Sequence, residues 1–221
     1  MAALTDLSFE DFVEFQFGQA VRPCGNPWYC DLDGDWWAPE PRTGIGYLTR
    51  LFSNGSQVLQ WFSDAQIAQG LTGLVTTAVG DQPWMRDPGT PAQERADAWT
   101  AVARFFEEVL EPRCSPALGH LSEEGAPLNL VTYMWWESFP GFANPDDPHR
   151  EVVDDAELDC LERILALGGA ACQEAALHGL GNWVRREPRC EAVIDNYLAS
   201  DRVARPELVT YARTARGGCI L

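Results

Sequence analysis

The final third of the chain, from residue 155 to residue 216, carries the pattern that most restricts its fold. Apolar residues recur there at the three- and four-residue spacing of amphipathic helices, in four successive segments. Gly168-Gly169 separates the first segment from the second, and a turn that contains Pro188 separates the second from the third. Connections this short make consecutive helices antiparallel neighbours. We therefore expect four packed helices, near residues 158–165, 172–183, 193–198 and 208–215.

Small residues in the second of these segments, such as Ala175, Ala176 and Gly179, allow helices to approach closely. Together with the short turns, they are typical of HEAT or armadillo stacks. The sequence predicts a HEAT-like antiparallel helical stack over residues 154–216. Stacks of this kind usually act by presenting a surface, so the pattern favours a binding protein.

Helix signals continue through residues 1–145, at less regular spacing. Ser8 and Asp11 mark one helix start, Ser63 and Gln66 form a capping-box pair, and Thr90-Pro91 opens a further helix. The residues between Pro127 and Trp136 are apolar on nearly every side, which predicts a helix in the centre of the domain. The expected helices cover residues 8–17, 45–52, 63–78, 90–110, 114–121 and 127–136.

No segment shows the alternation of a β-strand, so the predicted fold is all-α. We expect a single compact domain over residues 1–221, in which an irregular helical N-terminal half packs on the HEAT-like stack. A subdivision into residues 1–145 and 154–216 is the alternative, because residues 144–159 form a connector with seven carboxylates.

The chain has a net charge of −17, and all of its 16 basic side chains are arginines. The lack of lysine indicates a GC-rich bacterial genome. An acidic surface repels phosphate backbones, which argues against nucleic acid and favours a basic protein as partner. The alternative is that the acidic residues serve solubility alone. Residues 185–221 are the exception, with seven arginines against five acids.

The first ten residues lack the pattern of a secretory signal, and no apolar stretch is long enough to cross a membrane. The seven cysteines are irregularly spaced and include no CxxC pair. This usage fits a reducing compartment. We expect a cytoplasmic protein that does not bind membranes.

The strongest chemical pair in the sequence is Glu174 with His178, four residues apart and hence on one helix face. A carboxylate and an imidazole in this arrangement could bind a metal or share a proton. A metal site needs further ligands, and none recurs at this spacing. The competing interpretation is structural, with His178 bound to a backbone carbonyl of a neighbouring helix.

Residues 22–43 are rich in proline, glycine and tryptophan, which predicts a long ordered loop. Its run from Asp31 through Asp33 to Asp35 has its glycine too early for an EF-hand, so an aspartate-rich turn is expected. Trp28, Trp36 and Trp37 would anchor a partner if exposed, with the aspartates around them. If buried, these tryptophans cover the N-terminal helices, which is the interpretation we favour.

Familiar catalytic and cofactor motifs are lacking. The serines are not in a nucleophile-elbow sequence, a Walker site needs the lysine that the chain lacks, and no GxGxxG follows a strand. His120 and His149 fall in expected loops. No cofactor is predicted.

The run from Ala171 to Trp183, ACQEAALHGLGNW, resembles a segment of an uncharacterised bacterial protein family with a HEAT-like C-terminal half. The similarity extends to residues 47–52, 62–66, 69–71 and 129–136, and thus spans most of the chain. The resemblance implies a soluble bacterial helical protein. It brings no assigned activity and no catalytic residues.

These observations lead to one principal hypothesis and two alternatives. The principal one is a non-catalytic interaction protein, in its sharpest form an immunity or antitoxin-like factor whose acidic surface covers a basic toxin. The alternatives are a metal-dependent enzyme with a site at Glu174 and His178, and a structural subunit of an assembly.

Overall fold

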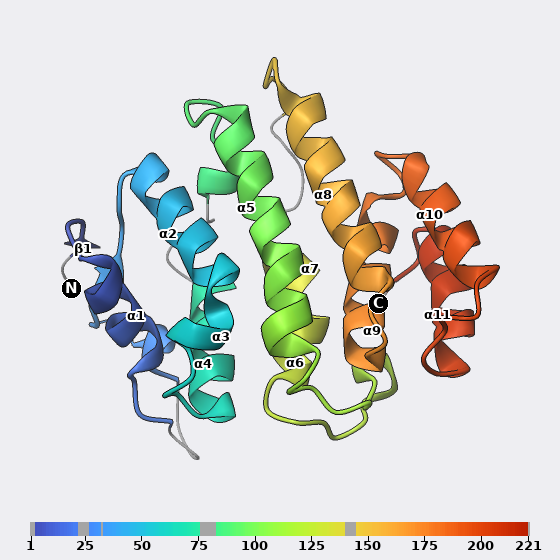
Figure 1. Cartoon of the computed structure of the whole chain (residues 1–221), viewed down its shortest axis with the longest axis horizontal. Coiled ribbons are helices and arrows are strands. Elements are labelled where there is room, and N and C mark those ends of the chain that lie inside the picture. The colour runs from blue at the N-terminus through green and yellow to red at the C-terminus, as the bar shows by residue number, and fades with distance from the viewer. Residues whose placement is uncertain (1–2, 22–26, 32, 76–82, 140–144, 221) are drawn as a thin grey trace.

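The computed structural model in Figure 1 describes residues 3–21, 27–31, 33–75, 83–139 and 145–220. Helices account for nearly all of its regular structure, which confirms the all-α expectation. Three expectations lie partly outside the described residues. They are the loop over 22–43, the last turn of the helix expected over 63–78, and the first residue of the acidic connector expected over 144–159.

The helices and strands of the described residues have the following bounds. The α-helices are α1 (Phe9–Phe17), α2 (Pro41–Ser53), α3 (Gly55–Val58), α4 (Asp64–Val75), α5 (Ala92–Phe105), α6 (Asn129–Tyr133), α7 (Trp135–Ser138), α8 (Arg150–Leu165), α9 (Ala170–Trp183), α10 (Arg189–Leu198) and α11 (Glu207–Arg216). Shorter helical turns are η1 (Trp28–Cys30), η2 (Pro83–Met85), the π-helical η3 (Phe106–Leu110) and η4 (Gly119–Leu121). The strands are β1 (Ala3–Leu4) and β2 (Trp36–Trp37).

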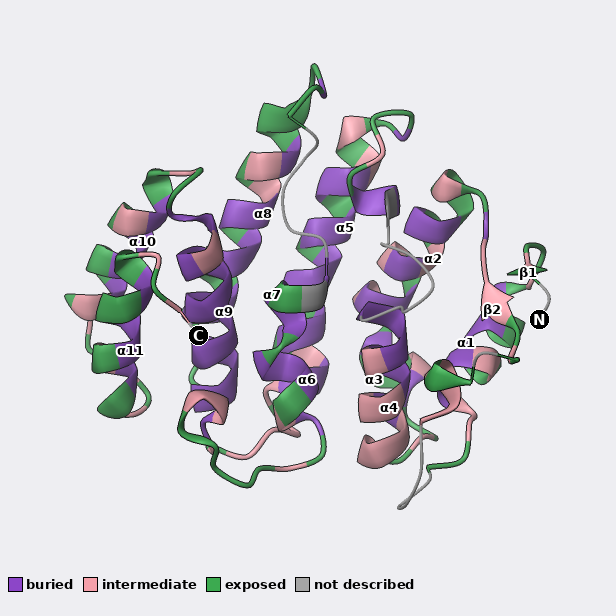
Figure 2. Ribbon diagram, turned by 180° about the vertical axis from the view of Figure 1, so that it is seen from behind, coloured by how far each residue is buried: buried purple, intermediate pink, exposed green. Residues whose placement is uncertain are grey.

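The long helices form two layers. One layer contains α2, α5 and α8 and is the nearer one in Figure 1. The other contains α4, α6, α7 and α9 and is the nearer one in Figure 2, which shows the molecule from the opposite side. Within the layers α2 packs on α5 and α5 on α8, and α9 packs on α6 and α7. α10 and α11 complete the C-terminal edge, where α11 lies against α9. The N-terminal half, expected to be irregular, thus contributes helices to the same two layers as the C-terminal half.

Two of the predicted helix starts are confirmed in atomic detail. The Ser8 hydroxyl accepts a hydrogen bond from the Asp11 N–H at 3.1 Å. Ser63 and Gln66 bond each other's backbone N–H groups at 3.3 Å and 3.1 Å, which is the reciprocal pattern of a capping box. The cap expected from Thr90 is wrong: Pro91 occupies the N-cap position of α5, and the Thr90 hydroxyl donates to Asp87 Oδ2 at 3.4 Å.

Two expected helices in the middle of the chain differ in the structure. Residues 114–121 are helical only in the single turn η4. The helix expected over 127–136 is divided at Met134 into α6 and α7. Its side chains are not buried on every side, since Leu130 is 71% exposed and Met134 is 36% exposed. The run of apolar residues therefore predicted helical structure here but predicted more complete burial than Leu130 and Met134 have.

The acidic connector expected over 144–159 is largely helical, because α8 begins at Arg150. Val153, Leu158 and Leu161 point into the protein and are buried, while most carboxylates of α8 stay on the outside. The apolar residues of this helix pack against α5 and α9. The many carboxylates of the segment made the apolar face of this helix hard to recognise in the sequence.

The ladder between β1 and β2 was not expected, and at two residues per strand it is too short to show alternation. The strands are parallel, with Ala3 opposite Trp36 and Leu4 opposite Trp37.

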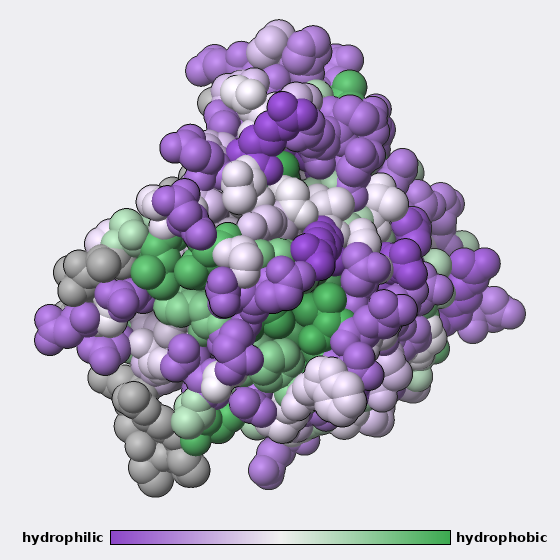
Figure 3. All heavy atoms as spheres, turned by 60° about the vertical axis from the view of Figure 1, so that its left-hand side comes forward, coloured by the Kyte–Doolittle hydropathy of each residue, from purple (hydrophilic) through white to green (hydrophobic). Residues whose placement is uncertain are grey.

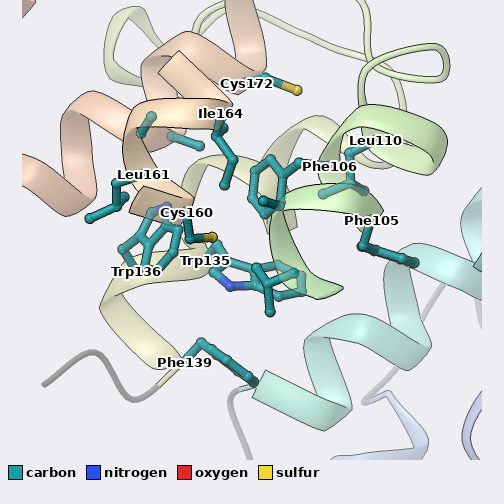
Figure 4. Packing of buried hydrophobic residues seen from close by; sticks show 14 of the residues in the cluster. Phe105, Phe106, Leu110, Trp135, Trp136, Phe139, Cys160, Leu161, Ile164 and Cys172 are labelled. Atoms are coloured by element: carbon teal, nitrogen blue, oxygen red, sulfur yellow. The ribbon is translucent and has the colours of Figure 1, made fainter. Parts of the chain in front are cut away.

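The core between the layers is dense in aromatic rings, as Figure 4 shows. Trp135 is fully buried and lies against Phe105, Phe106 and Phe139. Trp136 stacks on Trp99 with ring centroids 5.7 Å apart. Aromatic contacts of this kind join α7 of one layer to α5 of the other.

Candidate functional site

Glu174 and His178 lie one turn apart on α9, as the sequence predicted. Every residue of α9 from Ala170 to Gly181 is buried. Glu174 is 1% exposed and His178 is 2% exposed. The two side chains do not bond each other; each one has its own partners in a different part of the fold.

The Glu174 carboxylate holds the turn η4. Its Oε2 accepts a hydrogen bond from the Gly119 N–H at 2.8 Å. Its Oε1 accepts one from the His120 N–H at 2.9 Å and lies 2.5 Å from His120 Nδ1. Three donors on one buried carboxylate satisfy most of its acceptor capacity, so this charge is well compensated.

His178 bridges two other side chains. Its Nε2 lies 2.6 Å from Oε1 of Glu137 on α7, and its Nδ1 lies 3.0 Å from the Tyr211 hydroxyl on α11. The hydrogen bond from His178 lowers the pKa of Glu137, so that carboxylate is ionised and can only accept. His178 Nε2 therefore donates to Glu137, and its Nδ1 forms the hydrogen bond with the Tyr211 hydroxyl.

Tyr211 connects the two carboxylate–histidine pairs. Its ring stacks on His120 with centroids 4.3 Å apart, while its hydroxyl reaches His178. Tyr133 on α6 also shares a hydrogen bond with Tyr211 and meets the His178 ring edge-on at 5.0 Å. We call this set the histidine–tyrosine network; it consists of Glu174, His120, Tyr211, His178, Glu137 and Tyr133. It joins α6, α7, α9, α11 and η4.

The order Glu137, His178, Tyr211 has the sequence of groups found in hydrolase triads: carboxylate, imidazole, hydroxyl. A nucleophile needs access to substrate and a lowered pKa. Tyr211 is only 6% exposed, and its burial raises its pKa. The hydroxyl is therefore held as a neutral hydrogen-bond donor, and the geometry is that of a clamp between helices.

The metal hypothesis for Glu174 and His178 gains no further ligands. In the described part of the chain, no group of three or more histidine, cysteine, aspartate or glutamate side chains is placed to hold a metal ion. The competing structural interpretation was right about an interhelical bond. The partners of His178 are side chains, however, and not the backbone carbonyl that we expected.

No local pattern in the sequence indicates the partners that complete this network. His178 is 41 residues from Glu137 and 33 from Tyr211, and Glu174 is 54 residues from His120. His120 could be noticed as one of three histidines, but nothing local tied it to Glu174. Only the packing of α9 against its neighbours brings these groups together.

Two tryptophans of the loop over 22–43, Trp28 and Trp37, pack against the rest of the protein. Trp37 packs on Phe12 with centroids 4.1 Å apart and lies between Tyr47 and Trp84. Trp28 meets Phe15 edge-on at 5.4 Å. Both tryptophans, and Trp36, are half-buried. This packing agrees with the interpretation of Trp28 and Trp37 as a cover for the N-terminal helices.

The aspartates of the same loop point the other way. Asp31, Asp33 and Asp35 are all exposed, and Asp31 Oδ1 accepts a hydrogen bond from the Asp33 N–H at 3.1 Å. That bond closes the aspartate-rich turn expected from the sequence. The described part of the loop thus offers its aspartates to solvent, whereas Trp28 and Trp37 pack against the protein.

Within the described ranges, each helix is too short or too polar to span a lipid bilayer. No protein-family model matches the chain, and no curated protein or solved structure is significantly similar to it.

Proposed function

We propose that this chain is a non-catalytic binding protein that uses an acidic surface to hold a basic protein partner, in the manner of an immunity or antitoxin-like factor. The observation that carries the proposal is a row of carboxylates along α8. Glu151, Asp155, Asp159 and Glu162 are all exposed. Their spacing of four, four and three residues places them on one face of the helix.

Repulsion within this row of carboxylates destabilises an isolated helix. Like charges four residues apart destabilise a helix by about 0.2–0.5 kcal/mol per pair. Asp155 is paired with Arg189 at 2.5 Å, but within the described residues Glu151, Asp159 and Glu162 form no salt bridge. A partner that supplies cations would remove the repulsion, which is the reason that the row favours a basic protein.

A second exposed feature suits the same role. Trp61, in the turn between α3 and α4, is 85% exposed. Tryptophan is enriched among the residues that dominate binding energy at protein interfaces. Figure 3 brings the end of the molecule with the N-terminal helices forward, and it shows apolar side chains framed by hydrophilic ones. The layered helix pairs support the comparison with HEAT-like stacks, which bind through such surfaces.

The histidine–tyrosine network supports the non-catalytic form of the proposal. Its hydroxyl is buried with a raised pKa, and its carboxylates are occupied by neighbours within the fold. Its residues do the work of holding helices together. A reaction centre would instead offer a reactive group to substrate.

The test uses two variants that remove the same charge. The α8 variant carries Glu151→Gln, Asp159→Asn and Glu162→Gln. The matched control carries Asp6→Asn, Glu14→Gln and Glu40→Gln, three other exposed carboxylates. Wild-type protein and both variants are immobilised, and partners are captured from the source cells at about 0.1 M and about 1 M salt, where the screening length falls from about 10 Å to about 3 Å.

The proposal predicts that a basic protein is retained at low salt by the wild type and the control, and is lost from the α8 variant and at high salt. Equal recovery by all three proteins at both salt concentrations would show that the acidic row does not bind the partner.

A further inference from the structure

Two cysteines in the C-terminal half of the chain face one cavity. The cavity has a volume of about 240 Å³. Its wall is formed by residues between 111 and 116, which follow η3, by residues 168–172 at the start of α9, and by Arg205 with its neighbour in the chain. Cys114 contributes from the first of these segments and Cys172 from the second. The volume is smaller than the roughly 300–1,000 Å³ of pockets for drug-sized ligands, so the cavity admits only a small reagent.

A direct contact holds the two cysteine-bearing segments together. Oε1 of Glu111 accepts hydrogen bonds from the N–H groups of Gly168 and Gly169, at 2.8 Å and 2.9 Å. Cys114 follows Glu111 by three residues, and Cys172 follows Gly169 by three residues. Because three residues make up about one helical turn, each cysteine lies about one turn beyond this contact.

The two sulfur atoms are directed toward each other's segments. Cys114 Sγ lies 3.4 Å from the hydroxyl oxygen of Thr132 on α6, and α6 packs against α9. In Figure 4 the Cys172 sulfur points away from α9, toward the side of the core where Leu110 lies. The Leu110 carbonyl accepts a hydrogen bond from the Cys114 N–H at 2.8 Å, so Cys114 belongs to the same turn. The Cys172 sulfur therefore faces the turn that carries Cys114.

The two thiols differ in their access to solvent. Cys114 is half-buried, whereas Cys172 is completely buried. A reagent that enters the cavity therefore meets Cys114 first. Burial raises the pKa of Cys114 to about 11, and burial also raises the pKa of Cys172, with a further contribution from the charges of Cys114 and Glu111. Since the thiolate is the reactive form, both thiols react slowly at neutral pH.

We propose that Cys114 and Cys172 form a reversible disulfide when the protein meets a small organic disulfide, and that this bond ties the turn after η3 to the first turn of α9. The Cys114 thiolate attacks one sulfur of the reagent and breaks its S–S bond. A mixed disulfide forms, and the small thiol that leaves takes up the proton from Cys114. The Cys172 thiolate then attacks Cys114 Sγ and releases the second small thiol, which takes up the proton from Cys172. Two protein thiols are oxidised, and one reagent disulfide is reduced to two thiols.

The crosslink acts on the part of the fold that holds the histidine–tyrosine network. It closes a loop that contains η4, α6, α7 and α8. Glu174, two residues after Cys172 on α9, is the side chain that binds η4. A disulfide restricts the unfolded chain, so the crosslinked protein should resist unfolding more than the reduced one. In a reducing compartment such bonds are transient and respond to oxidation. The crosslink does not rest on the proposed function, because no residue of the acidic row takes part.

The test uses the full chain with Cys24, Cys30 and Cys219 replaced by serine, so that only the pair and the two cysteines buried on α8 and α10 remain. The folded protein is incubated with hydroxyethyl disulfide at mildly alkaline pH, its remaining thiols are alkylated after unfolding, and mass spectrometry of the digest identifies linked peptides. Circular dichroism before digestion shows that the protein stays folded. We expect one linked peptide, which joins residues 114 and 172, while the thiols on α8 and α10 are recovered alkylated.

Variants and pH separate the two steps. Cys172→Ala should stop the reaction at the mixed disulfide on Cys114, whereas Cys190→Ala should leave the crosslink unchanged. Because only the thiolate attacks, the rate of the reaction should rise about tenfold for each pH unit around neutrality. The charged groups that face the pair or line its cavity are Asp64, Glu111 and Arg205.

The linked peptide decides the proposal even if Cys172→Ala does not fold, since it is sought in protein that keeps both cysteines. The crosslinked protein should melt at a higher temperature than the reduced protein, and a small thiol should restore the reduced form. The absence of the linked peptide, its formation only in urea, a different pairing, or a crosslinked protein that melts no higher than the reduced one would overturn the proposal.

Discussion

Replacing Tyr211 by phenylalanine removes one oxygen atom from the histidine–tyrosine network and nothing else. The ring remains, so its stacking on His120 at 4.3 Å is retained and no cavity opens. His178, which is 2% exposed, loses the partner of its Nδ1 and cannot turn to water. Leaving a buried polar group unsatisfied costs about 1–3 kcal/mol, and we expect Tyr211→Phe to lower the free energy of unfolding by that amount.

Urea unfolding at neutral pH measures this change, and the slope with urea should be the same in both proteins. In a thermal melt the loss corresponds to about 2–4 °C for each kcal/mol in a chain of this size. Tyr29→Phe is the matched control, because the Tyr29 hydroxyl has no hydrogen-bond partner among the described residues. A free energy of unfolding within about 0.5 kcal/mol of the wild type for Tyr211→Phe would refute the view of the network as a clamp.

Three further changes have expected outcomes. Gly179→Ala should lower the free energy of unfolding by about 1–3 kcal/mol, since its Cβ would lie within 2.9 Å of Leu161 and Trp136. Gly46→Ala, whose Cβ would meet open space, should raise the free energy of unfolding by up to about 1 kcal/mol. Urea unfolding compares the two variants. Glu157→Gln should remove a decline in wild-type stability with pH: a carboxyl with a raised folded pKa contributes stability below the usual glutamate value of about 4.3, and that stability is lost as pH rises toward the raised value. If the free energy of unfolding, measured at several pH values, changed with pH in the same way in both proteins, this prediction for Glu157 would be contradicted. Trp61→Ala should leave the free energy of unfolding within about 0.5 kcal/mol of the wild type and should weaken partner binding. Thermal melting tests the first outcome, and titration with the captured partner tests the second.

Helix positions in the C-terminal third could be predicted from the sequence because they depend on local patterns. The apolar spacing and the Gly168-Gly169 break located α9 and the C-terminal end of α8 within a few residues, whereas α8 begins at Arg150, about two turns before the expected start near residue 158. Ser8 and Ser63 also signalled helix starts correctly, since a cap involves only neighbours in the chain. Thr90 does not cap α5, because its hydroxyl donates to Asp87 and the N-cap position falls on Pro91.

The candidate site was less accessible to such reasoning. Glu174 and His178 stood out by their spacing, yet that spacing suggested a bond between them that does not exist. Their actual partners come from η4, α7 and α11, and no short-range rule predicts which helices will meet. The burial of Glu157 was equally hidden, because it is one of seven carboxylates in the acidic segment and only packing distinguishes it.

The central question is whether the protein acts through its acidic exterior or through its buried network. The rate at which the captured partner associates with three folded variants decides it. These are the α8 variant, the matched N-terminal control and Tyr211→Phe, compared by association kinetics at low salt. We predict that the α8 variant associates at least about tenfold more slowly, while the other two behave like the wild type. Unchanged association of the α8 variant, together with loss of binding in a folded Tyr211→Phe protein, would place the function in the network instead.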